Sequence, residues 1–281
     1  MLLTYYTLDA LARAWRPGLV GCRVGDAFSQ ERGELTLALA SERAEWMLRV
    51  STQAPFYFIF RSEGYSRARR NVATLFEDAF GRHVEAVRLA DRDRMLFLDL
   101  DDGSRFQVVL FGPRANVFLV GPEGTIREAF QEDERWEGEP APAPRAAPEV
   151  ETFEAFEARW RTNRKTLEQA VASAFPLFDR TLAAEAVHRA GLPEKPPADA
   201  TEADRRALFD AAAALRAALA DPAPRIYWKG RFAEAFALVP LRHLEALEAE
   251  PFEHVDAAVR VYVRRRLAEE RFRARYEPLE Q

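Results

Sequence analysis

The sequence has few of the residues on which several common kinds of site depend. Its 281 residues include one cysteine, Cys22, and four histidines, so no intrachain disulfide and no cysteine-based metal cluster can form. No two histidines stand at the i, i+4 spacing of a helical metal site. Glycine-rich phosphate loops and the Gly-x-Ser-x-Gly nucleophile motif are also missing from the sequence. We therefore expect no metal, no cofactor and no enzyme activity.

Long apolar segments are missing too. The longest apolar stretch, Pro55 to Phe60, is far shorter than the roughly 18 residues of a membrane span. The first residues, Met1 to Tyr6, lack the basic and apolar regions of a secretory signal. Hydrophobic residues nevertheless make up 48% of the chain, enough for a substantial core. The sequence predicts a globular protein of the reducing cytoplasm without a membrane partner.

Lysine is rare, and positive charge comes almost entirely from arginine. The three lysines are Lys165, Lys195 and Lys229, and the net charge is −5 with a sequence pI of about 5.6. This charge argues against a protein that coats nucleic acid over its whole surface. Arginine suits planar, bidentate contacts with phosphate, so any contact with nucleic acid is expected to be local.

Residues 1–131 are predicted to form one α+β domain. A short amphipathic helix at Thr7 to Trp15 is expected to stop at Pro17, and a second helix is expected over Ser66 to Phe80. Between and after them, period-two patterns predict a meander of strands, with a hairpin turn at Asp101 to Gly103. The expected strands are 23–29, 34–40, 46–52, 56–61, 84–89, 94–100, 106–111 and 117–120.

The remainder of the chain is predicted to be largely helical. Residues 132–149 are acidic and rich in proline, which is typical of a stiff, solvated linker. A helical domain over 150–252 should contain helices at 153–174, 182–190 and 202–219 and a small hairpin at 226–238. Residues 253–281 are expected to begin a coiled-coil arm.

Two arginine clusters could contact phosphate. Arg67, Arg69 and Arg70 stand near the start of the helix expected over Ser66 to Phe80, where a helix N-terminus would favour an anion. A solvated helix face explains the same pattern. Six arginines between Arg264 and Arg275 form a second cluster, which a solvated coiled-coil face also explains.

Several motifs together resemble the NFACT family, which was first named for fibronectin-binding protein A. They are Leu3 to Tyr6, Tyr65 to Asn71, the Asp93-Arg94 pair and Phe111 to Val117. The most specific is the run Glu185 to Leu192, preceded by Pro176 to Phe178.

The resemblance implies a fold as well as a family. It implies an N-terminal fold similar to that of formamidopyrimidine-DNA glycosylases, a helix-hairpin-helix region after it, and the first part of a coiled-coil arm. Glycosylase chemistry requires a Pro-Glu amino terminus, where this sequence has Met1-Leu2. Because the family pattern continues into a longer coiled coil and an RNA-binding domain, the chain is expected to be a fragment or a short family member.

The function implied by the resemblance is ribosome quality control. The family binds a stalled large ribosomal subunit that carries peptidyl-tRNA, and it positions alanine tRNA for template-free tailing of the nascent chain. The resemblance assigns the tRNA contact to Asp93 and Arg94, which we expect to be largely exposed. The residues expected to contact RNA or phosphate are Arg67, Arg69, Arg70, Arg114 and Asn116.

Three alternatives remain open from the sequence. The chain could be a fibronectin-binding surface adhesin, as the family name suggests, or a glycosylase-like nucleic-acid-binding protein, by analogy of fold alone. For Asp93 and Arg94, a structural salt bridge at the strand junction competes with the tRNA contact.

Overall fold

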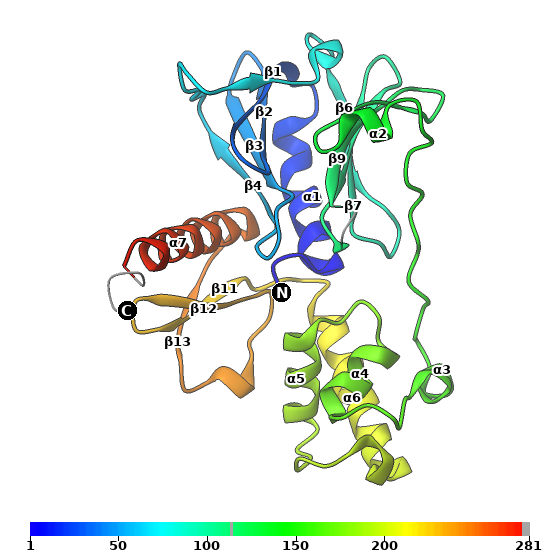
Figure 1. The fold of residues 1–281 in the computed structure, drawn as a ribbon. Helices are drawn as coiled ribbons and strands as arrows, with labels where there is room; N and C mark the ends of the chain where they lie inside the picture. Colours follow the sequence, from blue (N-terminus) through cyan, green and yellow to red (C-terminus); the bar gives the residue numbers. More distant parts are fainter. Residues whose placement is uncertain (113–114, 277–281) are drawn as a thin grey trace. The chain divides into compact units, whose positions relative to one another are not determined.

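The computed structural model describes residues 1–112 and 115–276, with side chains through Arg273 (Figure 1). Contacts within the chain divide it into two compact units. The sheet unit is Leu8–Ala146, and the helical unit is Met1–Thr7 together with Ala147–Gln281.

The described part of the sheet unit contains two five-stranded antiparallel sheets. The first has the order β4-β3-β2-β1-β5 and the second β10-β9-β8-β7-β6. The strands of the first are β1 Arg23–Glu31, β2 Glu34–Ala40, β3 Glu45–Ser51, β4 Phe58–Glu63 and β5 Ala73–Thr74. Those of the second are β6 Val84–Leu89, β7 Met95–Leu100, β8 Arg105–Val109, β9 Asn116–Val120 and β10 Ile126–Ala129. The eight expected strands are confirmed, and β5 and β10 are additional.

Helix α1 (Tyr5–Leu19) contributes Leu8, Leu11 and Trp15 to the core. The expected stop at Pro17 is wrong, because the helix continues through this proline for two more residues. Proline lacks the N–H that would bond to the preceding turn, but the complete burial of Leu19 stabilises the last turn. Near this end of the helix, Arg16 Nε donates to Val87 O of β6 over 2.8 Å.

The Asp101 to Gly103 turn joins β7 and β8 as expected. Gly103 has φ +79°, a conformation that few residues other than glycine adopt readily. Asp102 Oδ1 accepts the N–H of Ser104 over 3.0 Å, which is ordinary turn chemistry for aspartate.

The helix expected over Ser66 to Phe80 is wrong. Asn71 and Phe76 have φ values of 57° and 55°, which no right-handed helix contains. Residues 73–74 instead pair as β5 with β1, and a one-turn 3-10 helix, η1, covers Glu77–Ala79. The Phe76 N–H donates to the Glu128 carboxylate over 2.7 Å, and its ring packs edge-on against Phe106. Partners from distant parts of the sequence thus replace the local helical bonds.

The helical unit contains helices followed by a three-stranded sheet and a long last helix. The single helix expected over 153–174 is two helices, α3 and α4, separated at Trp160 and capped anew at Thr166, whose Oγ1 accepts the N–H of Gln169. The elements are α3 Phe153–Arg159, α4 Leu167–Ala174, α5 Arg180–Arg189, η3 Pro197–Asp199, α6 Glu202–Ala218, β11 Arg225–Lys229, β12 Phe232–Ala237, η4 Arg242–Leu244, β13 Glu248–Pro251 and α7 Val255–Tyr276. The last helix packs on β12 and begins where the sequence predicts.

The segment expected as a solvated linker is bonded to the sheet unit for most of its length. Within it, α2 (Asp133–Trp136) places the Trp136 ring edge-on against Phe118, with centroids 5.2 Å apart. The following residues run extended along the second sheet, and the division between the units falls after Ala146. Separate folding of the two units stays a prediction.

Candidate nucleic-acid interface

The β6–β7 turn holds Asp93 and Arg94 in different environments. Arg92 adopts φ 48°, and this left-handed residue turns the chain so that Asp93 faces inward. Only 8% of Asp93 is exposed. Its Oδ1 accepts the N–H of Arg94 over 2.7 Å. The expectation that both residues are largely exposed is therefore wrong for Asp93.

Asp93 also anchors a distant part of the chain. Its Oδ2 accepts the backbone N–H of Arg145 over 2.6 Å. Residues 140–146, called the proline segment here, are held at two further points: Gln107 Nε2 donates to Pro142 O over 2.7 Å, and the Ala141 N–H donates to Gly124 O over 3.0 Å. Because both carboxylate oxygens accept backbone N–H groups, Asp93 fixes the turn and the segment together. The hydrogen bonds described for the Asp93 carboxylate thus go to the backbone.

Arg94 is exposed beside an aromatic ring. Its guanidinium carbon lies 4.9 Å from the centroid of Phe111, a cation–π distance. Phe111 itself packs at the edge of the core cluster around Phe118. The structure thus brings together two motifs that are separate in the sequence, the Asp93-Arg94 pair and the segment that begins at Phe111. Arg114 lies outside the described residues.

Asn116 has a structural role at the start of β9. It is 2% exposed, and its Nδ2 donates to Gln131 O over 2.8 Å. Its Oδ1 accepts the N–H groups of Gln131 and Val117 over 2.8 and 2.9 Å. The Asn116 amide is buried and hydrogen-bonded within the protein, so it exposes no polar surface for the expected contact with RNA.

The arginines at 67, 69 and 70 do not form one set, and they do not stand on a helix. Arg67 Nη1 pairs with both carboxylate oxygens of Asp26 over 2.7 and 2.8 Å, and its Nη2 donates to Thr74. The Asp26 hydrogen bond raises the pKa of Tyr65, whose hydroxyl donates to the same carboxylate over 2.7 Å. Arg69 and Arg70 are exposed and have no hydrogen bond or ion pair within the described residues. Only these two remain available for phosphate.

The run beginning at Glu185 encloses a buried carboxylate that sequence reasoning did not single out. Glu185 is fully buried on α5, where its Oε1 accepts Arg189 Nε over 2.6 Å and its Oε2 lies 2.7 Å from His243 Nδ1. Burial raises its pKa, but the hydrogen bonds from His243, the Arg242 N–H and Arg189 outweigh burial and lower it to about 2. The only signal in the sequence was a glutamate among the apolar residues of a helix.

The second arginine cluster lies on α7. Arg264, Arg265, Arg271 and Arg273 are exposed, whereas Arg266 Nη1 pairs with Glu269 over 3.5 Å. Arg265 lies over the Trp228 ring, 5.9 Å from its centroid. The side chain of Arg275 is outside the described residues. Both explanations of this cluster, a phosphate contact and a solvated face, therefore stay open.

The described residues contain neither a metal-binding cluster nor a membrane-spanning helix. No group of three histidine, cysteine or acidic side chains there is arranged to hold a metal ion. Among those residues, too, every helix is too short or too polar to cross a membrane.

Known proteins share both the sequence pattern and the fold. A family model described as "NFACT N-terminal and middle domains" matches residues 4–281. A comparison with curated protein sequences finds no match. Solved structures are similar at low sequence identity, which supports a common fold.

Three solved structures illustrate this fold. The fibrinogen-binding protein from Staphylococcus aureus has a TM-score of 0.70 at 14% identity, over 92% of this chain and 98% of that one. The N-terminal part of a fibronectin/fibrinogen-binding protein from Streptococcus suis has a TM-score of 0.61 at 17% identity, with the same coverage. The N-terminal domain of a fibronectin-binding protein from Streptococcus pneumoniae has 0.50 at 16%, over 94% and 99%. Since the family model covers nearly every residue, the chain belongs to the NFACT family and spans its N-terminal and middle domains.

Proposed function

We propose that this protein binds tRNA through Arg94 and serves as a ribosome quality-control factor. The observation that carries the proposal is the exposed Arg94 guanidinium over the Phe111 ring. An arginine above an aromatic ring offers paired donors for phosphate and base edges and a flat surface for stacking. Membership of the NFACT family supports tRNA as the RNA partner.

Asp93 acts in this proposal as a positioning residue. Its carboxylate accepts the N–H of Arg94 and is itself buried, so it sets the backbone from which Arg94 projects. RNA would then contact Arg94, while Asp93 keeps the turn in one conformation. This division of roles replaces the expectation that both side chains face the tRNA.

Arg69 and Arg70 would add contacts that do not depend on base sequence. Both are exposed and unpaired within the described residues, and phosphate contacts position RNA without reading it. Because the net charge is −5, long-range attraction to RNA is weak and binding would depend on such local groups. Binding should therefore weaken steeply as salt increases.

In the cell, the complete protein would bind the large ribosomal subunit with its peptidyl-tRNA and place alanine tRNA beside it. The ribosome would carry out peptide transfer, so this protein would need no catalytic residue. Because its proposed partner is the ribosome, we propose the cytoplasm as its location.

The test is recovery of tRNA and ribosomal subunits with the full-length protein from its own cells. Arg94→Ala should lower tRNA recovery by about tenfold or more, with the large subunit still bound. Arg43→Ala is the matched control, because Arg43 is an exposed arginine in a hairpin turn without an ion pair in the described residues. Undiminished tRNA recovery with folded Arg94→Ala protein would refute the assignment.

A second candidate is binding of an extracellular matrix or plasma protein. The similar structures are named as proteins that bind fibrinogen or fibronectin, and this is the observation that favours it. Immobilised fibronectin and fibrinogen, titrated with the protein at physiological salt, would test it. Saturable binding that Arg94→Ala leaves unchanged, together with no tRNA in the purified complex, would favour this function over the first.

A further inference from the structure

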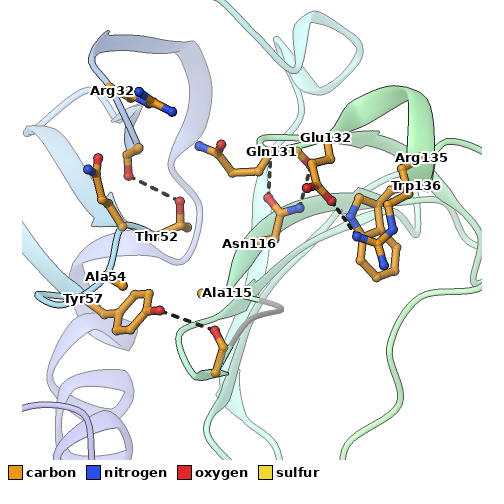
Figure 2. Close-up of a pocket in the computed structure, with 13 residues that line it drawn as sticks. Arg32, Thr52, Ala54, Tyr57, Ala115, Asn116, Gln131, Glu132, Arg135 and Trp136 are labelled. Carbon is orange, nitrogen blue, oxygen red and sulfur yellow. Dashed lines mark hydrogen bonds and ion pairs between the residues drawn. The ribbon is translucent and has the colours of Figure 1, made fainter.

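A polar pocket of about 410 Å³ lies within the sheet unit, where loops of its two sheets meet (Figure 2). One side is formed by Arg32 and Gly33 of the β1–β2 turn and, from the β3–β4 connection, by Thr52, Gln53, Ala54 and Tyr57. The other side is formed by Ala115, Asn116, Gln131, Glu132, Arg135 and Trp136. Gly112, the residue after Phe111 in the chain, also lines it.

Several polar groups of this pocket have no partner in the described part of the protein. Arg32 is exposed and makes no ion pair there, and the side-chain amides of Gln53 and Gln131 make no hydrogen bond there. Glu132, the acidic residue of the lining, is neutralised by Arg135 Nη1 at 2.7 Å from its Oε2. The uncompensated charge of the described lining is therefore the positive charge of Arg32.

The walls are fixed by bonds that do not use these groups. Asn116 holds the backbone N–H and C=O of Gln131, and the Tyr57 hydroxyl donates to Gly112 O over 3.4 Å. Thr52 donates to Gly33 O through both its N–H, over 2.9 Å, and its Oγ1, over 3.3 Å. Figure 2 shows Arg32, Tyr57 and Gln131 around the opening. The unpaired groups thus stand on backbone that is already ordered.

We propose that this pocket binds one unpaired nucleotide of the RNA partner. Arg32 would contact the phosphate, since a guanidinium matches phosphate oxygens. The Gln53 and Gln131 amides offer paired donors and acceptors of the kind that read a base edge. The half-buried Tyr57 ring offers a surface on which a base can stack, as in the recognition of splayed single-stranded RNA. The lining is more polar than apolar, which favours a polar ligand.

This inference rests on the proposed RNA-binding function, but it concerns a different group of residues from Arg94. The two sites are linked through the chain, because Gly112 lines the pocket and Phe111, the residue before it, lies against Arg94. The inference therefore adds a nucleotide subsite to the proposed interface.

The test is titration of the protein with each of the four nucleoside 5′-monophosphates, with the matching nucleosides, and with ribose 5-phosphate. The Gln53→Ala/Gln131→Ala variant keeps every backbone hydrogen bond described above and should lower affinity for the preferred monophosphate by about tenfold or more. Arg32→Ala should lower affinity for the monophosphate and leave affinity for the nucleoside unchanged. Arg43→Ala is the matched control and should change neither.

Binding that needs the glutamines for the base and Arg32 for the phosphate supports the subsite. Three results would overturn it: no saturable binding of any monophosphate, ribose 5-phosphate bound as tightly as the monophosphates, or an equal loss with Arg43→Ala. Loss of the subsite alone leaves the proposed function intact, because tRNA recovery through Arg94 is measured separately. Conversely, unchanged tRNA recovery with Arg94→Ala refutes the proposed function even where monophosphates bind.

Discussion

The Asp93 carboxylate accepts the backbone N–H of Arg145, 52 residues further along the chain. The same carboxylate accepts the N–H of its neighbour Arg94. The residue for which we expected a tRNA contact from the sequence is thus buried and bonded to the protein's own backbone. Asp93 would therefore affect RNA binding indirectly, by holding the β6–β7 turn in one conformation.

The two residues of the pair should differ in their effect on stability. Asp93→Ala leaves two backbone N–H groups without their acceptor and should lower the free energy of unfolding by about 1–3 kcal/mol. Arg94→Ala removes an exposed side chain and should change it by no more than about 0.5 kcal/mol. Urea unfolding of both variants measures this. Equal, small effects would show that Asp93 does not anchor the turn.

The bond between Asp93 and Arg145 should also control proteolysis. Arg145 is exposed and its peptide unit is held by Asp93, and cleavage requires local release of the backbone. Limited trypsin digestion should therefore cut after Arg145 faster in Asp93→Ala than in the unaltered protein.

Arg94→Ala is the control for this digestion, because the bond that holds Arg145 is made by the Asp93 carboxylate and uses no atom of the Arg94 side chain. It should be cut at the unaltered rate. In every variant, early cleavage inside 84–120 would contradict the predicted division into two folding units.

The salt dependence of RNA binding should show whether Arg69 and Arg70 contact phosphate. Arg69→Ala/Arg70→Ala should reduce the slope of log affinity for RNA against log salt by about two, about one for each lost phosphate contact, because fewer counterions are released. The protein should remain as stable as before. Fluorescence titration at several salt concentrations measures the slope, with Arg43→Ala as the control. An unchanged slope would exclude both arginines from the interface.

The pKa of Glu185 predicts a loss of stability in acid. Its folded-state pKa of about 2 lies below the ordinary value of 4.5, so the stabilisation is complete above about pH 4.5 and is lost as the pH falls toward 2. The contribution is on the order of a few kcal/mol. Unfolding measured between pH 7 and pH 2.5 should show it.

Glu185→Gln is the matched variant, since it keeps the shape of the side chain and cannot titrate. Its stability should be lower at neutral pH and should change less between pH 4.5 and 2. A pH dependence as steep as that of the unaltered protein would assign the acid sensitivity to other carboxylates.

Much of the fold follows from local patterns. Alternation along strands such as Glu34–Ala40 and the turn at Asp101 to Gly103 predict the meander, because both depend on neighbours only a few residues away. The motifs around Asp93 and Glu185 point to the family for the same reason. The small strand β13, Glu248–Pro251, escapes prediction because all four of its residues are exposed and show no alternation.

For the candidate site, too, some features follow from local sequence and others depend on the tertiary structure. The sequence by itself determined the composition, the antiparallel strands and the family, since these reside in residue types and short spacings. Only the tertiary structure decided that Asp93 is buried, that Arg94 lies on Phe111 and that residues 66–80 form no α-helix. The reason is that these outcomes depend on hydrogen bonds and packing between segments far apart in the chain, such as Phe76 with Glu128, and no local periodicity records them.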